Sequence, residues 1–192
     1  HTRCLSDWSS DVCSSDLFDL SFAGFCYRPP ADQLILALKF GHRTALASWL
    51  GQQLFDAIPD RYWQDDAPDC LIPVPLSRQR LQERGFNQAL EIARMLSRLS
   101  GVPVWPDATE RLRDTQPQAS LPLSERKRNL HQAFGWRAEQ GVLPAGRHVA
   151  LVDDVMTSGM TLHEIATMLK LNGARRVSVL LAARTPSPGD AL

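Results

Sequence analysis

The sequence has no net charge, no long apolar run and no closely spaced cysteine pair. Its 21 Lys and Arg residues balance 21 Asp and Glu residues, so the overall charge gives no argument for nucleic-acid binding. No stretch approaches the ~20 apolar residues that span a bilayer. The polar residues 1–17 also lack the apolar segment of a signal peptide. These absences favour a cytoplasmic protein without a membrane span.

The four cysteines, Cys4, Cys13, Cys26 and Cys70, include no Cys-x-x-Cys pair. A zinc ribbon requires such pairs, so the sequence predicts no zinc site in this chain. A disulfide framework is not expected for scattered cysteines without a secretion signal. The five histidines have no partner at metal-ligand spacing and are expected to be structural.

The length of 192 residues and the apolar content of 44% are those of one globular domain. Residues 1–17 repeat Ser-Asp without helical or strand periodicity, and we expect a non-native or disordered leader there. Residues 18–186 are expected to form a single domain, with a helical N-terminal part over 18–62 and a core over 63–186. Residues 187–192 are expected to be a tail.

Apolar periodicity predicts the main elements. Helices are expected over Ala31–Phe40, Ala45–Ile58, Gln88–Leu99, Ser124–Phe134 and Leu162–Leu171. Strands are expected over Cys70–Pro75, residues 148–152 and Val177–Ala183, and residues 103–121 are expected to be irregular or extended. Continuous apolar strands that alternate with helices indicate a parallel sheet covered on both faces, and therefore an α/β fold.

The clearest functional pattern lies between the strand at 148–152 and the helix that follows it. Asp153 and Asp154 come first, and then Thr157, Ser158, Gly159, Met160 and Thr161 lead into the helix. Open parallel sheets bind ligands at this position, and a helix start attracts phosphate. The carboxylates suit sugar hydroxyls or Mg²⁺ held through water. The loop therefore predicts a ligand with a ribose diol and a 5-phosphate, and the alternative is an ordinary strand–turn–helix with solvated acids.

The middle of the chain is basic. From Pro73 to Phe134 there are ten Arg or Lys residues and six Asp or Glu residues. Arg80 and Arg84 lie in the loop expected after the strand at Cys70–Pro75, and the planar guanidinium group of arginine binds phosphate through two hydrogen bonds. This segment favours an anionic ligand, and the alternative is a solvated basic surface.

The run Leu151–Thr161 resembles the phosphoribosyl pyrophosphate (PRPP) motif of type I phosphoribosyltransferases. Three further stretches resemble the ComF/GntX family, the competence-protein-F-like proteins of bacteria. They are Leu38–Gly41; Ile72–Leu76 with Arg84–Ala89; and Arg111–Leu121 with Arg126–Asn129 and Ala133–Phe134. The resemblance covers about residues 22–185.

The resemblance implies a type I phosphoribosyltransferase fold, with a mostly parallel central sheet, flanking helices and a mobile flap. Asp153 and Asp154 would be the catalytic carboxylates and indirect Mg²⁺ ligands, and Arg80 and Arg84 would hold pyrophosphate. The flap would carry four residues that match the family's third motif: Thr115, Gln118, Arg126 and Asn129.

The chain departs from the family pattern at several places, of which Ser158 and Met160 are mild variants. The four-cysteine zinc ribbon with which family members commonly begin is absent or replaced by residues 1–17. Thr157 stands where purine-salvage relatives often carry an Asp as a candidate base, so that role does not carry over.

Three functions remain open from the sequence. The leading one is an enzyme that binds PRPP with Mg²⁺ and transfers the phosphoribosyl group to a nitrogen acceptor. The second is a competence protein that handles single-stranded DNA through the basic segment, alone or with other competence proteins. The third is a PRPP sensor that keeps the pocket without chemistry.

Overall fold

A computed structural model describes residues 18–41, 43–112, 133–137 and 144–186 of the chain. The predicted leader at 1–17, the predicted tail at 187–192 and the predicted flap residues lie outside these ranges. Within the described residues no helix has both the length and the apolar character needed to cross a bilayer.

The described residues form a central sheet of four strands, in the order β1-β6-β5-β2. Its strands are β1 (Leu20–Cys26), β2 (Cys70–Pro73), β5 (His148–Met156) and β6 (Arg176–Arg184). Every neighbouring pair is parallel. β5 and β6 are buried along most of their length, which explains why their sequences are continuous apolar runs rather than alternating ones.

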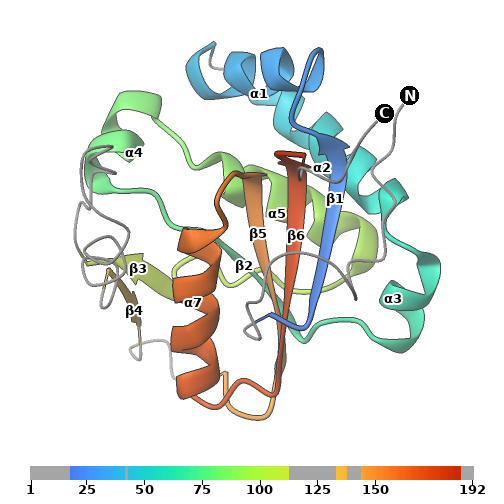
Figure 1. Cartoon of the computed structure of the whole chain (residues 1–192), viewed down its shortest axis with the longest axis vertical. Coiled ribbons are helices and arrows are strands. Elements are labelled where there is room, and N and C mark those ends of the chain that lie inside the picture. Colours follow the sequence, from blue (N-terminus) through green and yellow to red (C-terminus); the bar gives the residue numbers. More distant parts are fainter. Residues whose placement is uncertain (1–17, 42, 113–132, 138–143, 187–192) are drawn as a thin grey trace.

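Helices cover both faces of this sheet (Figure 1). The described helices are α1 (Ala31–Phe40), α2 (Ala45–Ala57), α3 (Asp60–Asp65), α4 (Arg78–Arg84), α5 (Gln88–Ser100) and α7 (Met160–Leu171). A separate two-stranded antiparallel ribbon pairs β3 (Thr109–Arg111) with β4 (Phe134–Trp136).

The sheet separates two apolar cores, and alternate residues of β5 contribute to each. Val149 and Leu151 pack with α7, whose buried stripe includes Leu162, Ile165 and Leu169. Ala150 and Val152 pack on the other face with residues of α2 and α5: Leu50, Leu54, Ile92 and Leu96. Side chains that alternate across a strand thus bind one helix layer to each face.

The predicted α/β class is confirmed, with a parallel sheet and helices on both faces. The predicted helix at Ala31–Phe40 is confirmed residue for residue, and the other predicted helices and strands that lie wholly in the described ranges agree except at their ends. The sequence did not predict α3, and β3 lies in the segment that was expected to be irregular or extended. The expectation of a purely helical segment at 18–62 missed β1, which pairs with β6 from the far end of the chain. β1 is an edge strand and only partly buried, so its sequence lacks the continuous apolar run of β5 and β6.

Two expectations in the middle of the chain were wrong. The helix expected over Ser124–Phe134 cannot extend to its last residue, because Phe134 begins β4 and pairs with Arg111; residues 124–132 lie outside the described ranges. The segment after β2, expected as a loop, contains α4. α4 buries none of its residues and so has no apolar face that a sequence pattern could show.

Candidate functional site

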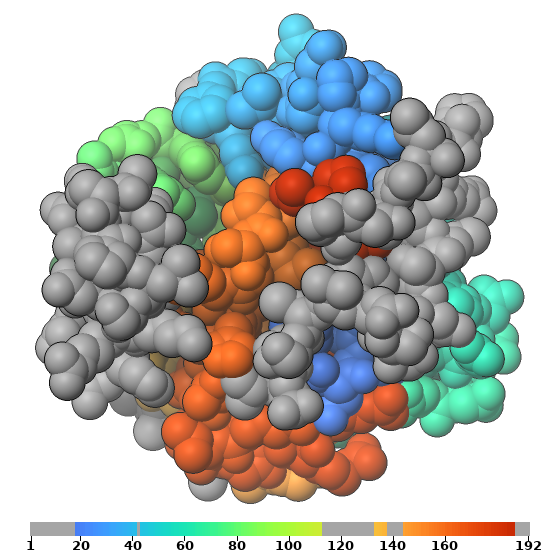
Figure 2. Space-filling view, in the orientation of Figure 1, coloured from blue at the N-terminus to red at the C-terminus, as the bar shows by residue number. Residues whose placement is uncertain are grey.

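The carboxyl ends of β5 and β2 meet at one edge of the sheet, where α7 and α4 begin. In Figure 2 the residues at the junction of β5 and α7 (orange) lie at the surface, between α1 (blue) and the α4–α5 region (green). β5 continues four residues beyond its predicted end, because pairing with β6 extends to Met156 and Arg184. Asp153 and Asp154 are therefore the last part of a strand rather than a loop.

Asp154 is a buried carboxylate with partners from two helices. Its Oδ2 lies 2.9 Å from Lys39 Nζ at the end of α1 and accepts a hydrogen bond of 3.3 Å from Gln88 Nε2 at the start of α5. Its Oδ1 accepts a 2.8 Å bond from the backbone N–H of Val155. Asp154 thus connects α1 and α5 to the end of β5 through these contacts, and it acts as a positioning residue.

Asp153 is half-buried, and its contact is local. Its Oδ1 accepts a 2.8 Å hydrogen bond from the backbone N–H of Asp154. Burial raises the pKa of Asp153 well above its ordinary value of 3.8, and the nearby charge of Asp154 adds to this, while Lys39 opposes it. A ligand hydroxyl or a cation that approaches such a carboxyl group stabilises its charged form. Of the two predicted acids, Asp153 is therefore the better placed to contact a ligand.

The predicted phosphate loop lies directly after β5. Thr157 and Ser158 are exposed, and Gly159 adopts φ +71°, a left-handed conformation that glycine accepts without a steric cost. Met160 and Thr161 open α7, and no side chain caps this helix. The first N–H groups of a helix have no partner within it, so this end can bind an anion.

α4 brings an arginine to the rim of the site. Ser77 Oγ caps the helix by accepting from Arg80 N at 3.3 Å. Arg84 Cζ lies 5.6 Å from the centre of the Phe40 ring, at the end of α1. Burial lowers the pKa of Arg84, and the charges of Asp154 and Asp153 act against that shift. Arg84 is therefore within electrostatic reach of both acids, whereas Arg80 is solvent-exposed one turn earlier.

The start of α5 is fixed by the motif around Asn87. Asn87 Nδ2 donates to the carbonyl of Val74 at 3.0 Å, and its Oδ1 caps α5 by accepting from Ala89 N at 3.0 Å. These bonds hold the following residue, Gln88, against Asp154. Sequence reasoning assigned no role to Lys39 or Gln88, although both lie in stretches that it singled out.

Protein side chains alone do not surround a metal ion in the part of the chain that the structure describes. No group of three or more His, Cys, Asp or Glu residues gathers there. Mg²⁺ takes six oxygen ligands and often keeps several waters. The chemistry of Asp153 and Asp154 fits a magnesium ion only if phosphate oxygens and water complete its shell.

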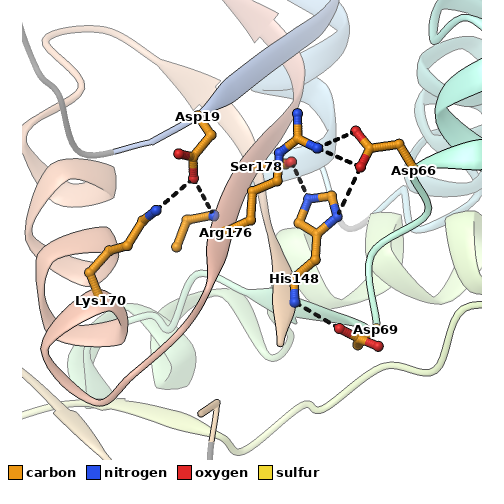
Figure 3. Close-up of polar contacts among 8 residues, drawn as sticks. Asp19, Asp66, Asp69, His148, Lys170, Arg176 and Ser178 are labelled. Carbon is orange, nitrogen blue, oxygen red and sulfur yellow. Dashed lines mark hydrogen bonds and ion pairs between the residues drawn. The ribbon is translucent and has the colours of Figure 1, made fainter. Parts of the chain in front are cut away.

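A second polar cluster lies at the opposite, amino ends of the strands (Figure 3). His148 Nε2 lies 2.6 Å from Ser178 Oγ, and His148 Nδ1 lies 3.9 Å from Asp66 Oδ1. Asp66 in turn accepts from Arg176. Ser178 and His148 are buried within the sheet, so no substrate can reach the serine hydroxyl. This arrangement joins β5, β6 and the loop before β2, and its role is structural.

Comparison with known proteins finds relatives over most of the chain. The DNA utilization protein YhgH of Shigella flexneri is 41% identical over 161 residues, which cover 83% of this chain and 69% of the relative. Competence protein F of Haemophilus influenzae is 36% identical over 160 residues, covering 82% and 69%. Competence protein ComFC of Bacillus subtilis is 32% identical over 118 residues, covering 60% and 41%. No family model matches.

Among solved structures, a glutamine PRPP amidotransferase from B. subtilis is 21% identical, with a TM-score of 0.47, and covers 71% of this chain and 26% of its own. A purine phosphoribosyltransferase from Pyrococcus horikoshii is 20% identical, with a TM-score of 0.43, and covers 74% and 80%. Both TM-scores lie below 0.5.

Proposed function

The chain belongs to the ComF family, and we propose that it binds a 5-phosphoribosyl ligand such as PRPP at the carboxyl ends of β2 and β5. The observation that carries this proposal is a juxtaposition on one strand and its loop. Asp153, a carboxyl group with a raised pKa, lies a few residues before Gly159 and the uncapped start of α7. A sugar phosphate offers hydroxyl groups to the Asp153 carboxyl and a phosphate anion to the start of α7.

Each part of the ligand has a proposed partner. The 5-phosphate binds the backbone N–H groups of Thr157, Ser158, Gly159, Met160 and Thr161, together with the hydroxyls of Thr157, Ser158 and Thr161. The ribose hydroxyls donate to Asp153, whose neighbour Asp154 is held by Lys39 and Gln88. Arg84 and the exposed Arg80 bind the pyrophosphate, since guanidinium groups match phosphate oxygens in shape and charge.

The leading reaction is transfer of the phosphoribosyl group to a nitrogen acceptor. Positioning and charge stabilisation account for most of the catalysis in such a site. A bound Mg²⁺ would neutralise pyrophosphate charge, and Asp153 is the side chain that would hold its water ligands, while Asp154 keeps its positioning role beside it. The predicted flap residues Thr115, Gln118, Arg126 and Asn129 would exclude water, but they lie outside the described residues.

Thermal stabilisation by a graded series of ligands tests the binding proposal. PRPP with Mg²⁺ and ribose 5-phosphate should both raise the melting temperature of the full chain. Asp153→Asn should reduce both shifts, because both ligands contain the ribose. Arg84→Ala should reduce the PRPP shift more than the ribose 5-phosphate shift. Arg94→Ala is the matched control, since Arg94 pairs with Glu91 on α5 instead.

Two results would count against the proposal. A wild-type chain whose melting temperature does not respond to either sugar phosphate has no such pocket. Equal losses for both ligands in Arg84→Ala would indicate a general field or folding effect rather than a pyrophosphate contact.

A second candidate function comes from the names of the relatives, which are a DNA utilization protein and competence proteins. In this reading the chain handles single-stranded DNA, and its pocket senses a phosphoribosyl ligand without turnover. Binding of a short oligonucleotide that weakens with salt, with a smaller salt dependence in Arg80→Ala, would support it. An assay of PRPP consumption with candidate bases separates the sensor from the transferase.

A further inference from the structure

Three of the six large apolar side chains that are exposed in the described part of the chain gather on α1 and α4. Phe40, the last residue of α1, is 68% exposed, and Leu36, one turn earlier on the same side of the helix, is 45% exposed. Leu81 of α4 is also 45% exposed. Arg84 joins the two helices, because it lies one turn after Leu81 and its Cζ is 5.6 Å from the centre of the Phe40 ring. Leu36, Phe40 and Leu81 therefore form one surface, the α1–α4 patch.

This patch differs from the other exposed apolar residues of the described chain, which stand apart. Trp49 stacks on Phe25, and Leu171 is the last residue of α7. Single apolar residues are ordinary on a protein surface, whereas a gathered set bordered by charge marks an interaction site. α4 buries none of its residues, so Leu81 has no role in either apolar core.

The border of the α1–α4 patch is positively charged. α4 contains three arginines and one glutamate, which gives it a net charge of +2. Arg78 is exposed and lies one turn before Leu81, and Arg84 lies one turn after it. On α1 the charge of Lys39 is balanced by Asp154, and Asp32 lies one turn before Leu36, at the far end of the patch. The positive charge is therefore concentrated around Phe40 and Leu81.

We propose that the α1–α4 patch docks an acidic, apolar segment of another protein. Leu or Phe side chains of that segment would pack on Leu36, Phe40 and Leu81, and its carboxylates would pair with the arginines of α4. Apolar anchors surrounded by complementary charge are the usual composition of such an interface. The proposal goes beyond the proposed function, because docking requires no sugar phosphate and uses Arg78, which the proposed ligand site does not.

Two other occupants fit the patch less well. A second copy of the chain would bring an identical positive border against the first in a symmetric pair, and like charges oppose that contact. Single-stranded DNA would supply negative charge, but its bases stack on aromatic rings. Two of the three patch residues are leucines, and one face of the Phe40 ring is already covered by Arg84.

Selection from a peptide display library on the full chain tests the proposal. Counter-selection on a Leu36→Ser/Phe40→Ser variant removes peptides that bind elsewhere. Both side chains are at the surface, so this variant should keep a melting temperature near that of wild type. Peptides enriched on wild type should combine Asp or Glu with Leu or Phe.

The most enriched peptide, made with a fluorescent label, then gives affinities by anisotropy. Phe40→Ser and Arg78→Glu should each weaken its binding about tenfold, as for residues at the centre and border of an interface. Leu171→Ser and Arg98→Glu are the matched controls, because Leu171 is 83% exposed on α7 and Arg98 is exposed on α5, both outside the patch. The controls should bind the peptide as wild type does.

Several results would overturn the proposal. They are a selection that enriches no peptide on wild type over the variant, enriched peptides that are neutral or basic, and equal losses in the patch and control variants. Sedimentation that shows a dimer abolished by Phe40→Ser would assign the patch to a second copy instead. An oligonucleotide that Phe40→Ser and Arg78→Glu weaken, where no acidic peptide binds, would assign it to DNA. Failure of PRPP to bind changes none of these results, so the two proposals are tested separately.

Discussion

Lys39→Met should destabilise the fold from a position at the edge of the proposed site. The substitution keeps the apolar stem of the side chain and removes the charge that lies 2.9 Å from Asp154. Asp154 is 5% exposed, so its carboxylate would remain buried without its cationic partner. Removing one partner of a buried ion pair lowers the free energy of unfolding by roughly 3–5 kcal/mol.

The expected loss is smaller here, for two structural reasons. The Lys39 side chain keeps 19% of its exposure, and Gln88 and the N–H of Val155 still donate to Asp154. We therefore expect a loss of about 2–3 kcal/mol. For a domain of this size that is a fall of roughly 4–12 °C in melting temperature.

Denaturant unfolding at pH 7 measures the loss, and Lys170→Met is the matched control. Lys170 also lies in the last turn of a helix and pairs with an acid, Asp19, at 2.8 Å, but both side chains of this pair are more exposed than Lys39 and Asp154. An exposed pair contributes ~0–1 kcal/mol. Equal losses in the two variants would refute the reasoning. So would strict additivity of Lys39→Met with Asp154→Asn, because a direct pair must show coupling.

Three further substitutions have predictable effects on stability. The pKa of Asp153 is raised in the folded chain, so its negative charge destabilises the fold increasingly as pH rises above 3.8. Asp153→Asn should therefore have a higher melting temperature than wild type at pH 7. This gain should become smaller as pH falls toward 4. Burial raises the pKa of Glu164 from 4.5 to about 7, so the stability of wild type should fall as pH rises through that interval. Glu164→Gln should not show this fall and should be more stable than wild type at pH 8. Parallel pH profiles of stability for the two proteins would contradict the assignment. Ser178→Ala removes the 2.6 Å partner of the buried His148 ring and should cost about 1–3 kcal/mol in denaturant unfolding, and an unchanged midpoint would show that the contact contributes nothing.

The sequence was sufficient for elements whose pattern is local. The apolar run from His148 to Val152 predicted a central parallel strand, and the stripe through Ile92 and Leu96 predicted an amphipathic helix. Both elements are buried by the packing of helices against the sheet. The pattern of apolar residues along the chain therefore follows the burial directly.

Features without a local apolar pattern, and contacts between distant residues, could not be predicted. β1 is a partly buried edge strand, and α4 has no buried face that would set a period. In the site, the Asp-Asp pair was visible, but the separation of its roles was not. Asp154 becomes a positioning residue because Lys39 and Gln88, far away in the chain, converge on it. No spacing in the sequence indicates that convergence.

Titration of the ¹⁵N-labelled chain with ribose 5-phosphate, followed through its backbone amide resonances, tests the central claim most directly. Binding at the proposed site should shift the amide resonances of Ser158, Gly159, Met160 and Thr161 most, since their N–H groups would donate hydrogen bonds to the phosphate. Asp153→Asn should weaken the titration without moving it elsewhere. Saturable shifts confined to another part of the chain, such as the amino ends of β5 and β6, or no shifts at all, would contradict the account.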